Sequence, residues 1–109
     1  MTYHVAVLPT AQRDLRRILR WVAERSPRGA ARLLAAFENR LHELGERPAS
    51  FGLAPESAHM VREIREFFFK TPRGRRYRGV FHVVGQTVEI LHVRGPGQDF
   101  LAQDELGQR

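Results

Sequence analysis

The chain has 109 residues, of which 42% are hydrophobic and 28% are charged, and it contains no cysteine. This length and balance predict one globular domain, residues 1–109, and argue against a disulfide framework, a thiolate metal site and a membrane span. The formal net charge is +6, and all but one of the 18 basic residues are arginine. Because arginine binds phosphate and carboxylate groups well, the expected partner is a polyanion or an acidic protein. The polar N-terminus lacks the features of a signal peptide, so a cytoplasmic protein is expected.

The N-terminal half predicts a strand followed by two helices. Residues 3–9 alternate and carry valines, which indicates a strand, and Thr10 is expected to cap the helix that follows. Apolar residues then recur at helical spacing as far as Ser26. Ser26 and Pro27 form a cap and first-turn pair for a second helix, which Gly45 is expected to close. The two helices should form a hairpin.

The C-terminal half predicts a loop and then strands. Residues 46–57 contain two prolines and a glycine without either periodicity, which is typical of a surface loop. Residues 77–84 and 87–93 predict two strands joined by a two-residue turn that begins at Gly85. The pattern is lost in the tail, and residues 102–109 are expected to be flexible.

The turn also predicts which side chains share a face of the hairpin. Counting outward from the turn places His82 opposite Glu89, and Tyr77 opposite Arg94. One face is then apolar and is expected to form the core: Phe81, Val83, Val88 and Ile90. The other face is mixed and is expected to stay at least partly open to solvent: Arg78, Val80, His82, Glu89 and Leu91.

Two basic elements are candidates for holding an anion. The stretch from Lys70 to Arg78 contains no acidic residue, and the first helix carries arginines at three- and four-residue intervals. Each element is either a solvated surface or part of a site for a nucleic-acid backbone or an acidic peptide. The arginines of the helix are Arg13, Arg16, Arg17 and Arg20. The candidate nucleic-acid-binding residues are Arg65, Arg73, Arg75, Arg76 and Tyr77.

His82 and Glu89 form the pair best suited to proton transfer, because a carboxylate orients an imidazole. An ordinary cross-strand polar pair is the alternative interpretation. The other histidines show no ligand spacing, so neither a metal site nor any other cofactor is predicted. The triplet Phe67, Phe68 and Phe69 is expected to divide between the core and a covered edge rather than stack on a base.

A strand, a helical hairpin and a terminal sheet carrying the segments IREF, RRYRGVF and VEILHVRGPGQDFL together resemble the RelE/ParE superfamily of toxins from bacterial type II toxin–antitoxin modules. The resemblance runs from residue 3 to about residue 101. It implies an α+β fold in which an N-terminal strand and a two-helix hairpin precede antiparallel strands packed on the helices. It also implies a protein that inhibits bacterial growth and is neutralised by a cognate acidic antitoxin.

Members of the superfamily have one of two activities, and the sequence does not decide between them. RelE-like members cut mRNA on the ribosome without a metal ion, whereas ParE-like members inhibit DNA gyrase. The long helical hairpin and the loop after it look closer to ParE. A third interpretation is a toxin fold that has lost its activity and survives as a nucleic-acid or protein binding module.

The similarity to RelE also implies roles for particular residues. The YR pair in YRGVF resembles the strand whose arginine stabilises the scissile phosphate, which makes Arg78 that candidate and Arg94 a second clamp. The lysines of the family's general base have no counterpart, because Val61 and Glu63 stand in their places. Glu63 or His82 is therefore the candidate base. The candidate catalytic residues are Arg78, Arg94, His82 and Glu63.

Overall fold

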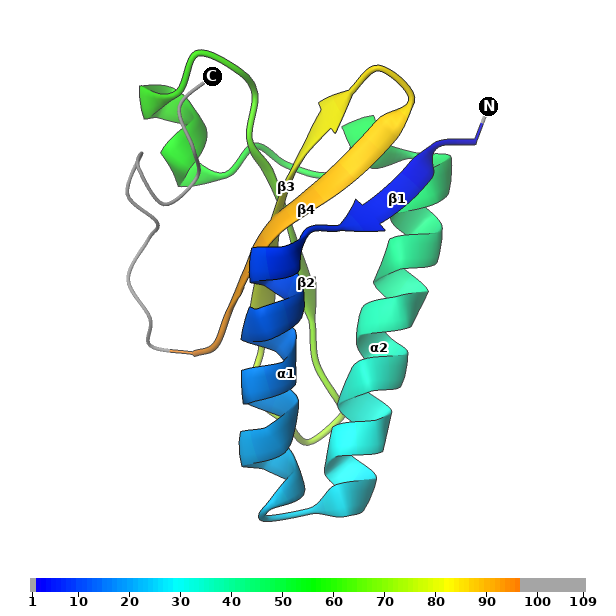
Figure 1. Cartoon of the computed structure of the whole chain (residues 1–109), viewed down its shortest axis with the longest axis vertical. Helices are drawn as coiled ribbons and strands as arrows, with labels where there is room; N and C mark the ends of the chain where they lie inside the picture. Colours follow the sequence, from blue (N-terminus) through cyan, green and yellow to red (C-terminus); the bar gives the residue numbers. More distant parts are fainter. Residues whose placement is uncertain (1, 97–109) are drawn as a thin grey trace.

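The structure is a computed structural model that describes residues 2–96. Its elements are β1 (His4–Val7), α1 (Pro9–Ala23), α2 (Pro27–Glu46), η1 (Pro48–Ser50), η2 (Pro55–His59), β2 (Arg65–Phe69), β3 (Tyr77–Val84) and β4 (Thr87–Arg94). Within residues 2–96, the strands form a four-stranded sheet of order β1-β4-β3-β2, and α1 and α2 cover one face of it (Figure 1). β1 runs parallel to β4, and the other neighbours are antiparallel. The predicted α+β fold is confirmed, whereas the predicted flexible tail, residues 102–109, lies outside the described residues.

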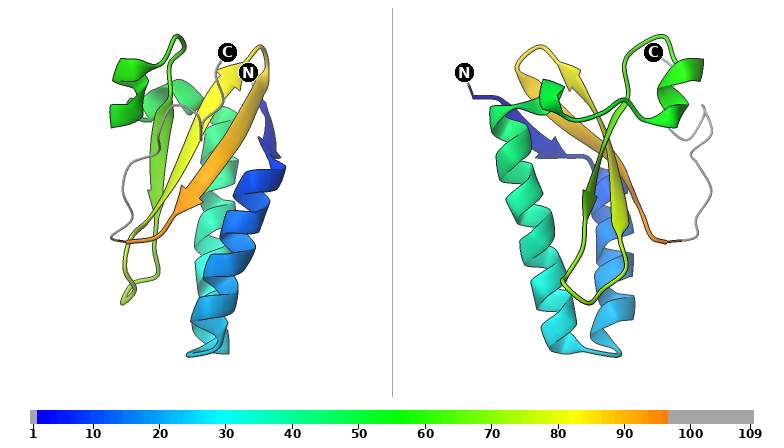
Figure 2. Two further views of the ribbon diagram at one scale, coloured as in Figure 1. Left: turned by 60° about the vertical axis from the view of Figure 1, so that its left-hand side comes forward. Right: turned by 180° about the vertical axis from the view of Figure 1, so that it is seen from behind.

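The helix boundaries follow from their first residues. α1 begins at Pro9, so the prediction that Thr10 caps this helix is wrong. Proline suits the first turn because its fixed φ is helical and it has no N–H that would need an acceptor. Ser26 caps α2 as predicted, since its hydroxyl accepts a hydrogen bond from the N–H of Gly29 at 2.9 Å. α1 already ends at Ala23, and the two helices lie side by side as the expected hairpin (Figure 2).

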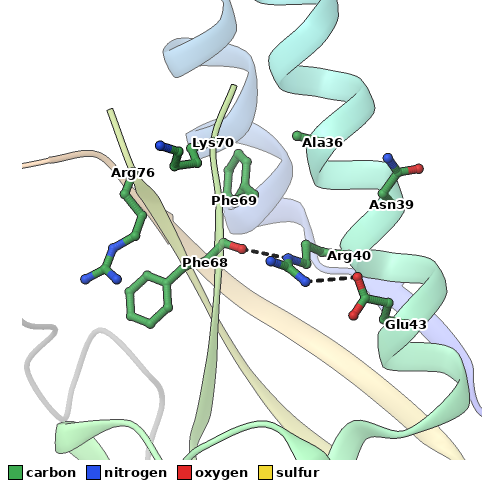
Figure 3. A pocket seen from close by; sticks show the side chains of 8 residues that line it. All are labelled: Ala36, Asn39, Arg40, Glu43, Phe68, Phe69, Lys70 and Arg76. Atoms are coloured by element: carbon green, nitrogen blue, oxygen red, sulfur yellow. Dashed lines mark hydrogen bonds and ion pairs between the residues drawn. The ribbon is translucent and has the colours of Figure 1, made fainter. Parts of the chain in front are cut away.

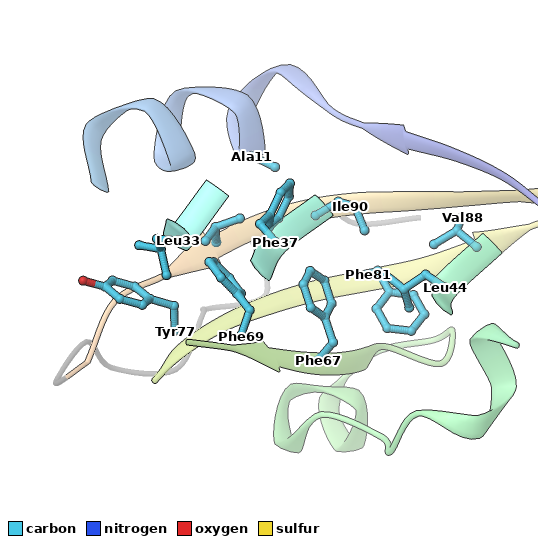
Figure 4. Close-up of a cluster of buried hydrophobic side chains, with 11 residues drawn as sticks. Ala11, Leu33, Phe37, Leu44, Phe67, Phe69, Tyr77, Phe81, Val88 and Ile90 are labelled. Atoms are coloured by element: carbon cyan, nitrogen blue, oxygen red, sulfur yellow. The ribbon is translucent and has the colours of Figure 1, made fainter. Parts of the chain in front are cut away.

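The main hydrophobic core lies between the sheet and the helices (Figure 4). Phe37 of α2 meets Phe67 and Phe69 of β2, with ring-centroid distances of 6.0 and 5.2 Å. Rings of this size supply much of the apolar burial in a small domain. Phe68 is only partly buried on the other face of the strand, so the predicted division of the aromatic triplet is confirmed. The buried core members are Ala11, Leu33, Phe37, Leu44, Phe67, Phe69, Tyr77, Phe81, Val88, Ile90 and Val93.

The hairpin of β3 and β4 has the predicted register near its turn and a different register farther out. The pairs nearest the turn are those counted from the sequence. Between Val80 and Phe81 the pairing shifts at a β-bulge, which places one extra residue in β4. Arg94 therefore lies opposite Arg78, and the predicted pairing of Arg94 with Tyr77 is wrong.

The second face of the sheet, expected to stay at least partly open, is largely covered: Val80, His82 and Leu91 are buried, whereas Arg78 and Glu89 stay partly exposed. Residues 54–64, which include η2, fold over this face, and the N–H of Ala54 donates to the carbonyl of Ile64 at 2.8 Å. Val80 is fully buried beneath this covering segment. The segment supplies the apolar side chains that the face needs, and the buried members of this second cluster are Ala54, Ile64, Val80 and Leu91. Val83, predicted in the main core, is 40% exposed because it lies near the hairpin tip, outside both clusters.

Candidate functional site

Arg78, the predicted phosphate-binding arginine, is enclosed by two glutamates. Its Nε donates to Glu66 Oε1 at 2.8 Å, and its Nη2 donates to Glu56 Oε1. The Arg78 side chain is 12% exposed and that of Glu56, which comes from η2, is 4% exposed. Burial opposes the charge on Arg78, but the hydrogen bonds and charges of Glu56 and Glu66 outweigh it and hold the pKa of the guanidinium above its ordinary value. The expectation that Arg78 faces open solvent is therefore wrong, because its donors serve internal ion pairs.

A pocket of about 260 Å³ lies beside His82, on the part of β3 that approaches the hairpin turn. Three of the residues predicted from the sequence meet here, namely Glu63, Arg65 and His82. Arg65 donates from Nη1 to the carbonyl of Phe51 at 2.5 Å and lies 3.2 Å from Glu63 Oε1 through Nη2. The Glu63 side chain is 69% exposed, so water weakens that ion pair. The full lining, which we call the His82 pocket, is Arg62, Glu63, Arg65, His82 and Val83.

Both ring nitrogens of His82 are engaged. Nε2 lies 2.6 Å from Glu89 Oε1, and Nδ1 lies 2.5 Å from Nε of Arg62. Because a guanidinium N–H can only donate, Nδ1 must carry the lone pair and Nε2 the proton in the neutral ring. Glu89 thus fixes the tautomer of His82, as the sequence predicted for this pair, and leaves Nδ1 as the basic nitrogen. The imidazole itself is buried, with 5% of its side chain exposed.

Sequence reasoning missed two residues that decide these contacts, Arg62 and Glu56. Both come from the covering segment, where no helical or strand period assigns side chains to a face. The segment VREIRE, residues 61–66, repeats one apolar and two charged residues, so it lacks the strict alternation that would have assigned Arg62 to one face of a strand. Glu56 lies outside this segment and had no signal of its own.

The four predicted catalytic residues do not form one constellation. Arg78 and Arg94 lie opposite each other near the open end of the hairpin, whereas His82 and Glu63 line the His82 pocket. Arg78 and His82 are four positions apart on β3, which corresponds to about 13 Å along an extended strand. A phosphate group in the His82 pocket would therefore meet Arg62 and Arg65, which line it, rather than Arg78, which Glu56 and Glu66 hold.

The basic loop between β2 and β3 remains mostly exposed. Arg73 and Arg75 are exposed, and they stay candidate contacts for nucleic acid. Arg76 lies over the ring of Phe68, with 4.0 Å between the guanidinium carbon and the ring centroid. Tyr77 differs, because it is 9% exposed and stacks on Phe69 at 5.7 Å. Its ring belongs to the core, so this candidate nucleic-acid-binding residue offers little surface to a ligand.

A second groove lies between α2 and β2, the strand at the edge of the sheet (Figure 3). It has a volume of about 460 Å³, and its charged side chains are Arg40, Glu43, Lys70 and Arg76. Arg40 is fixed there, since its Nε donates to the carbonyl of Phe68 at 2.9 Å and its Nη1 to Glu43 Oε1 at 2.9 Å. Arg40 therefore ties α2 to the sheet edge.

Across residues 2–96, no helix is long and apolar enough to cross a membrane. The same residues contain no group of three histidine, cysteine, aspartate or glutamate side chains placed to hold a metal ion.

A helical hairpin packed on one face of a four-stranded mixed sheet defines the class as a small α+β domain. The family model of the ParE toxin of the type II toxin–antitoxin system, parDE, matches residues 5–100. Toxin RelE1 of Caulobacter vibrioides is 45% identical over 93 residues, which cover 85% of this chain and 92% of that toxin. The chain therefore belongs to the ParE toxin family, within the RelE/ParE superfamily, and is the toxin of a type II toxin–antitoxin system.

Solved structures agree with this fold. A mutant of E. coli toxin RelE in the free state superposes with a TM-score of 0.57 at 16% identity, covering 89% of this chain and 86% of that one. The toxin–antitoxin complex RelBE2 of Mycobacterium tuberculosis matches with a TM-score of 0.55 at 25% identity, covering 87% of this chain and 99% of the matched chain. A cognate antitoxin is accordingly a partner of this protein.

Proposed function

We propose that this toxin arrests growth in the bacterial cytoplasm by cutting mRNA on the ribosome, and that the His82 pocket is its active site. The observation that carries this proposal is the oriented pair of His82 and Glu89 beside Arg62 and Arg65. RNA cleavage without a metal ion requires a general base and cationic groups that stabilise the phosphate. A histidine with a fixed tautomer beside two guanidinium groups supplies both. The similarity to Toxin RelE1 supports the same assignment.

The chemistry assigns one role to each side chain. The ribose 2′-hydroxyl attacks the adjacent phosphorus, its proton passes to Nδ1 of His82, and the bond from phosphorus to the 5′ oxygen of the next nucleotide breaks. Solvent protonates the leaving oxygen, so the products are a 2′,3′-cyclic phosphate and a 5′-hydroxyl. Glu89 stabilises the imidazolium that forms. Arg62 and Arg65 stabilise the pentavalent phosphate, and Arg62 leaves Nδ1 when it turns to that phosphate.

The experiment is primer extension on a message translated by purified ribosomes, with and without the toxin. His82→Gln should lower the cleavage rate at least about 100-fold, because general base catalysis contributes that much or more. Arg62→Ala, a change outside the core, should slow cleavage by a similar factor. His59→Ala is the matched control, because this histidine is exposed on η2 and does not line the pocket.

The outcomes separate the alternatives. Messages that stay intact with a toxin that still halts growth would overturn the proposal. A protein that neither cuts mRNA nor slows growth would support the inactive binding module. Cleavage that persists in His82→Gln, with the fold verified by circular dichroism, would reject the histidine as the base.

Gyrase inhibition is the second candidate, and two observations favour it. The matching family model is that of ParE, and the only lysine in the chain, Lys70, follows the end of β2 away from the His82 pocket. No lysine can therefore act as the base in that pocket. A supercoiling assay with purified gyrase tests this candidate, and inhibition at toxin concentrations that leave mRNA intact would establish it.

A further inference from the structure

We propose that a groove around Trp21 is the docking site for an acidic, apolar-anchored segment of the cognate antitoxin. This inference rests on membership of the type II toxin–antitoxin family and is independent of the toxin's target. The groove has a volume of about 350 Å³ and lies where α1 meets the outer ends of β3 and β4. It is lined mainly by Arg17, Ile18, Trp21, Arg75, Tyr77 and Pro96.

The residue types of this Trp21 groove are those that dominate protein–protein binding energy. Tryptophan, tyrosine and arginine are enriched among the side chains whose truncation costs most at interfaces. Trp21 is 53% exposed, although tryptophan has one of the largest apolar surfaces that a side chain can bury at an interface. Its indole is held by Arg25, whose guanidinium carbon lies 3.7 Å from the ring centroid. An exposed tryptophan held in one orientation beside the groove can therefore anchor a bound peptide.

The positive charge around the groove favours an acidic peptide as its ligand. The outward side of α1 carries four exposed arginines, namely Arg13, Arg16, Arg17 and Arg20. The one acidic residue of α1, Asp14, does not balance them, because its Oδ2 accepts the N–H of Val93 at 3.0 Å and lies 3.2 Å from Nδ1 of His92. Like charges at helical spacing repel one another, and carboxylates of a bound segment would relieve this repulsion.

The apolar floor of the groove favours a peptide over a nucleic acid. Ile18, Trp21 and Pro96 offer a hydrophobic hollow, and Arg17 and Arg75 bring charge to the same lining. This arrangement fits an apolar side chain flanked by carboxylates. A nucleic-acid backbone requires instead a track of cations that follows successive phosphates.

The Trp21 groove and the His82 pocket occupy different parts of the molecule. Tyr77 lines the groove and His82 lines the pocket, and these residues are five positions apart on β3, about 16 Å along the strand. A segment bound in the groove would not fill the pocket. Antitoxin binding and toxicity should therefore depend on different side chains.

Trp21 is the only tryptophan of the chain, and this allows a direct test. The full-length toxin, labelled with 5-fluorotryptophan, would give a single ¹⁹F NMR signal from the groove. Adding the unlabelled antitoxin of the same module should shift this signal at one equivalent. A poly-U oligonucleotide should leave it unchanged, and so should concentrating the toxin alone.

Variants supply the second readout. Trp21→Ala and Arg17→Glu should each weaken antitoxin binding at least tenfold by calorimetry. Leu53→Ala is the control, because Leu53 is 52% exposed and lies outside the groove, and its affinity should match the parent protein. Trp21→Ala should still arrest growth while escaping the antitoxin.

Each other outcome overturns the proposal. A ¹⁹F signal that the antitoxin does not move, or unchanged affinity of both variants, places the interface elsewhere. A shift caused by the oligonucleotide alone assigns the groove to nucleic acid, and a shift with toxin concentration assigns it to a second copy of the chain. None of these readouts depends on mRNA cleavage, so failure here is distinguishable from failure of the proposed activity.

Discussion

Replacing Arg78 by alanine should destabilise the fold rather than act only on catalysis. The change would leave two carboxylates, Glu56 and Glu66, without their cation, at side-chain exposures of 4% and 20%. Removing one partner of a buried ion pair costs about 3–5 kcal/mol, because the remaining charge keeps its desolvation penalty. A domain of this size has a free energy of unfolding of about 5–15 kcal/mol, so Arg78→Ala should be marginally folded.

The measurement is urea unfolding followed by far-ultraviolet circular dichroism. With a denaturant dependence of roughly 1.5 kcal/mol per molar urea, a loss of about 3–5 kcal/mol lowers the midpoint by about 2–3 M. Arg73→Ala is the matched control, since Arg73 is exposed in the same segment and should change stability by less than about 0.5 kcal/mol. Adding Glu56→Gln and Glu66→Gln to Arg78→Met should recover much of the loss, because the uncompensated charges are then absent.

A midpoint for Arg78→Ala within about 0.5 M of the parent protein would refute this reasoning. Arg78 would then be free of a structural role and available to a phosphate group, as the sequence resemblance implied. The unfolding experiment is therefore needed before activity assays of this variant can be interpreted. Loss of toxicity in Arg78→Ala is evidence about phosphate binding only after the folded fraction has been measured.

Two further substitutions test the packing of the sheet. Gly79→Ala would bring a Cβ within 2.1 Å of the buried ring of Phe67, so thermal unfolding should show a loss of at least about 1–3 kcal/mol. Gly52→Ala, which meets no atom within 4 Å, should leave the melting temperature nearly unchanged, and equal losses at both glycines would contradict the close contact. Asp14→Ala removes the acceptor of the Val93 N–H and should cost about 1–3 kcal/mol in urea unfolding; no loss would show that α1 and β4 are not joined there.

The hairpin shows which structural features the sequence could supply. A two-residue turn and the alternation of side chains specify the inner pairs of β3 and β4, because a shift by one residue would turn the apolar side chains outward. Gly85 has a φ of +60°, which agrees with a turn that favours glycine. The β-bulge between Val80 and Phe81, with its extra residue in β4, had no signal of its own, because no residue type in the sequence marks its position. The pairing of Arg94 was wrong for this reason.

The covering segment shows where sequence reasoning failed. Residues 46–57, whose last four residues begin this segment, contain turn-forming residues and no period, so a surface loop was the natural prediction. Tertiary packing determined the outcome instead, because Val80 and Leu91 form an apolar surface that Ala54 and Ile64 cover. The resemblance implied an N-terminal strand, a helical hairpin and antiparallel strands, but it carried no information about which side chains this segment would add.

Charge in the sequence and charge available for binding are different quantities. The stretch from Lys70 to Arg78 contains no acidic residue. In the folded protein, however, Arg78 donates hydrogen bonds to Glu56 and Glu66, which come from other segments. Arg73 and Arg75 stay exposed, whereas Arg78 is enclosed. The basic surface that a partner meets is therefore the loop and the outer side of α1, not the middle of the sheet. Our proposals place an acidic antitoxin segment on that surface, and the proposed chemistry at His82 relies on Arg62 and Arg65, which line the same pocket.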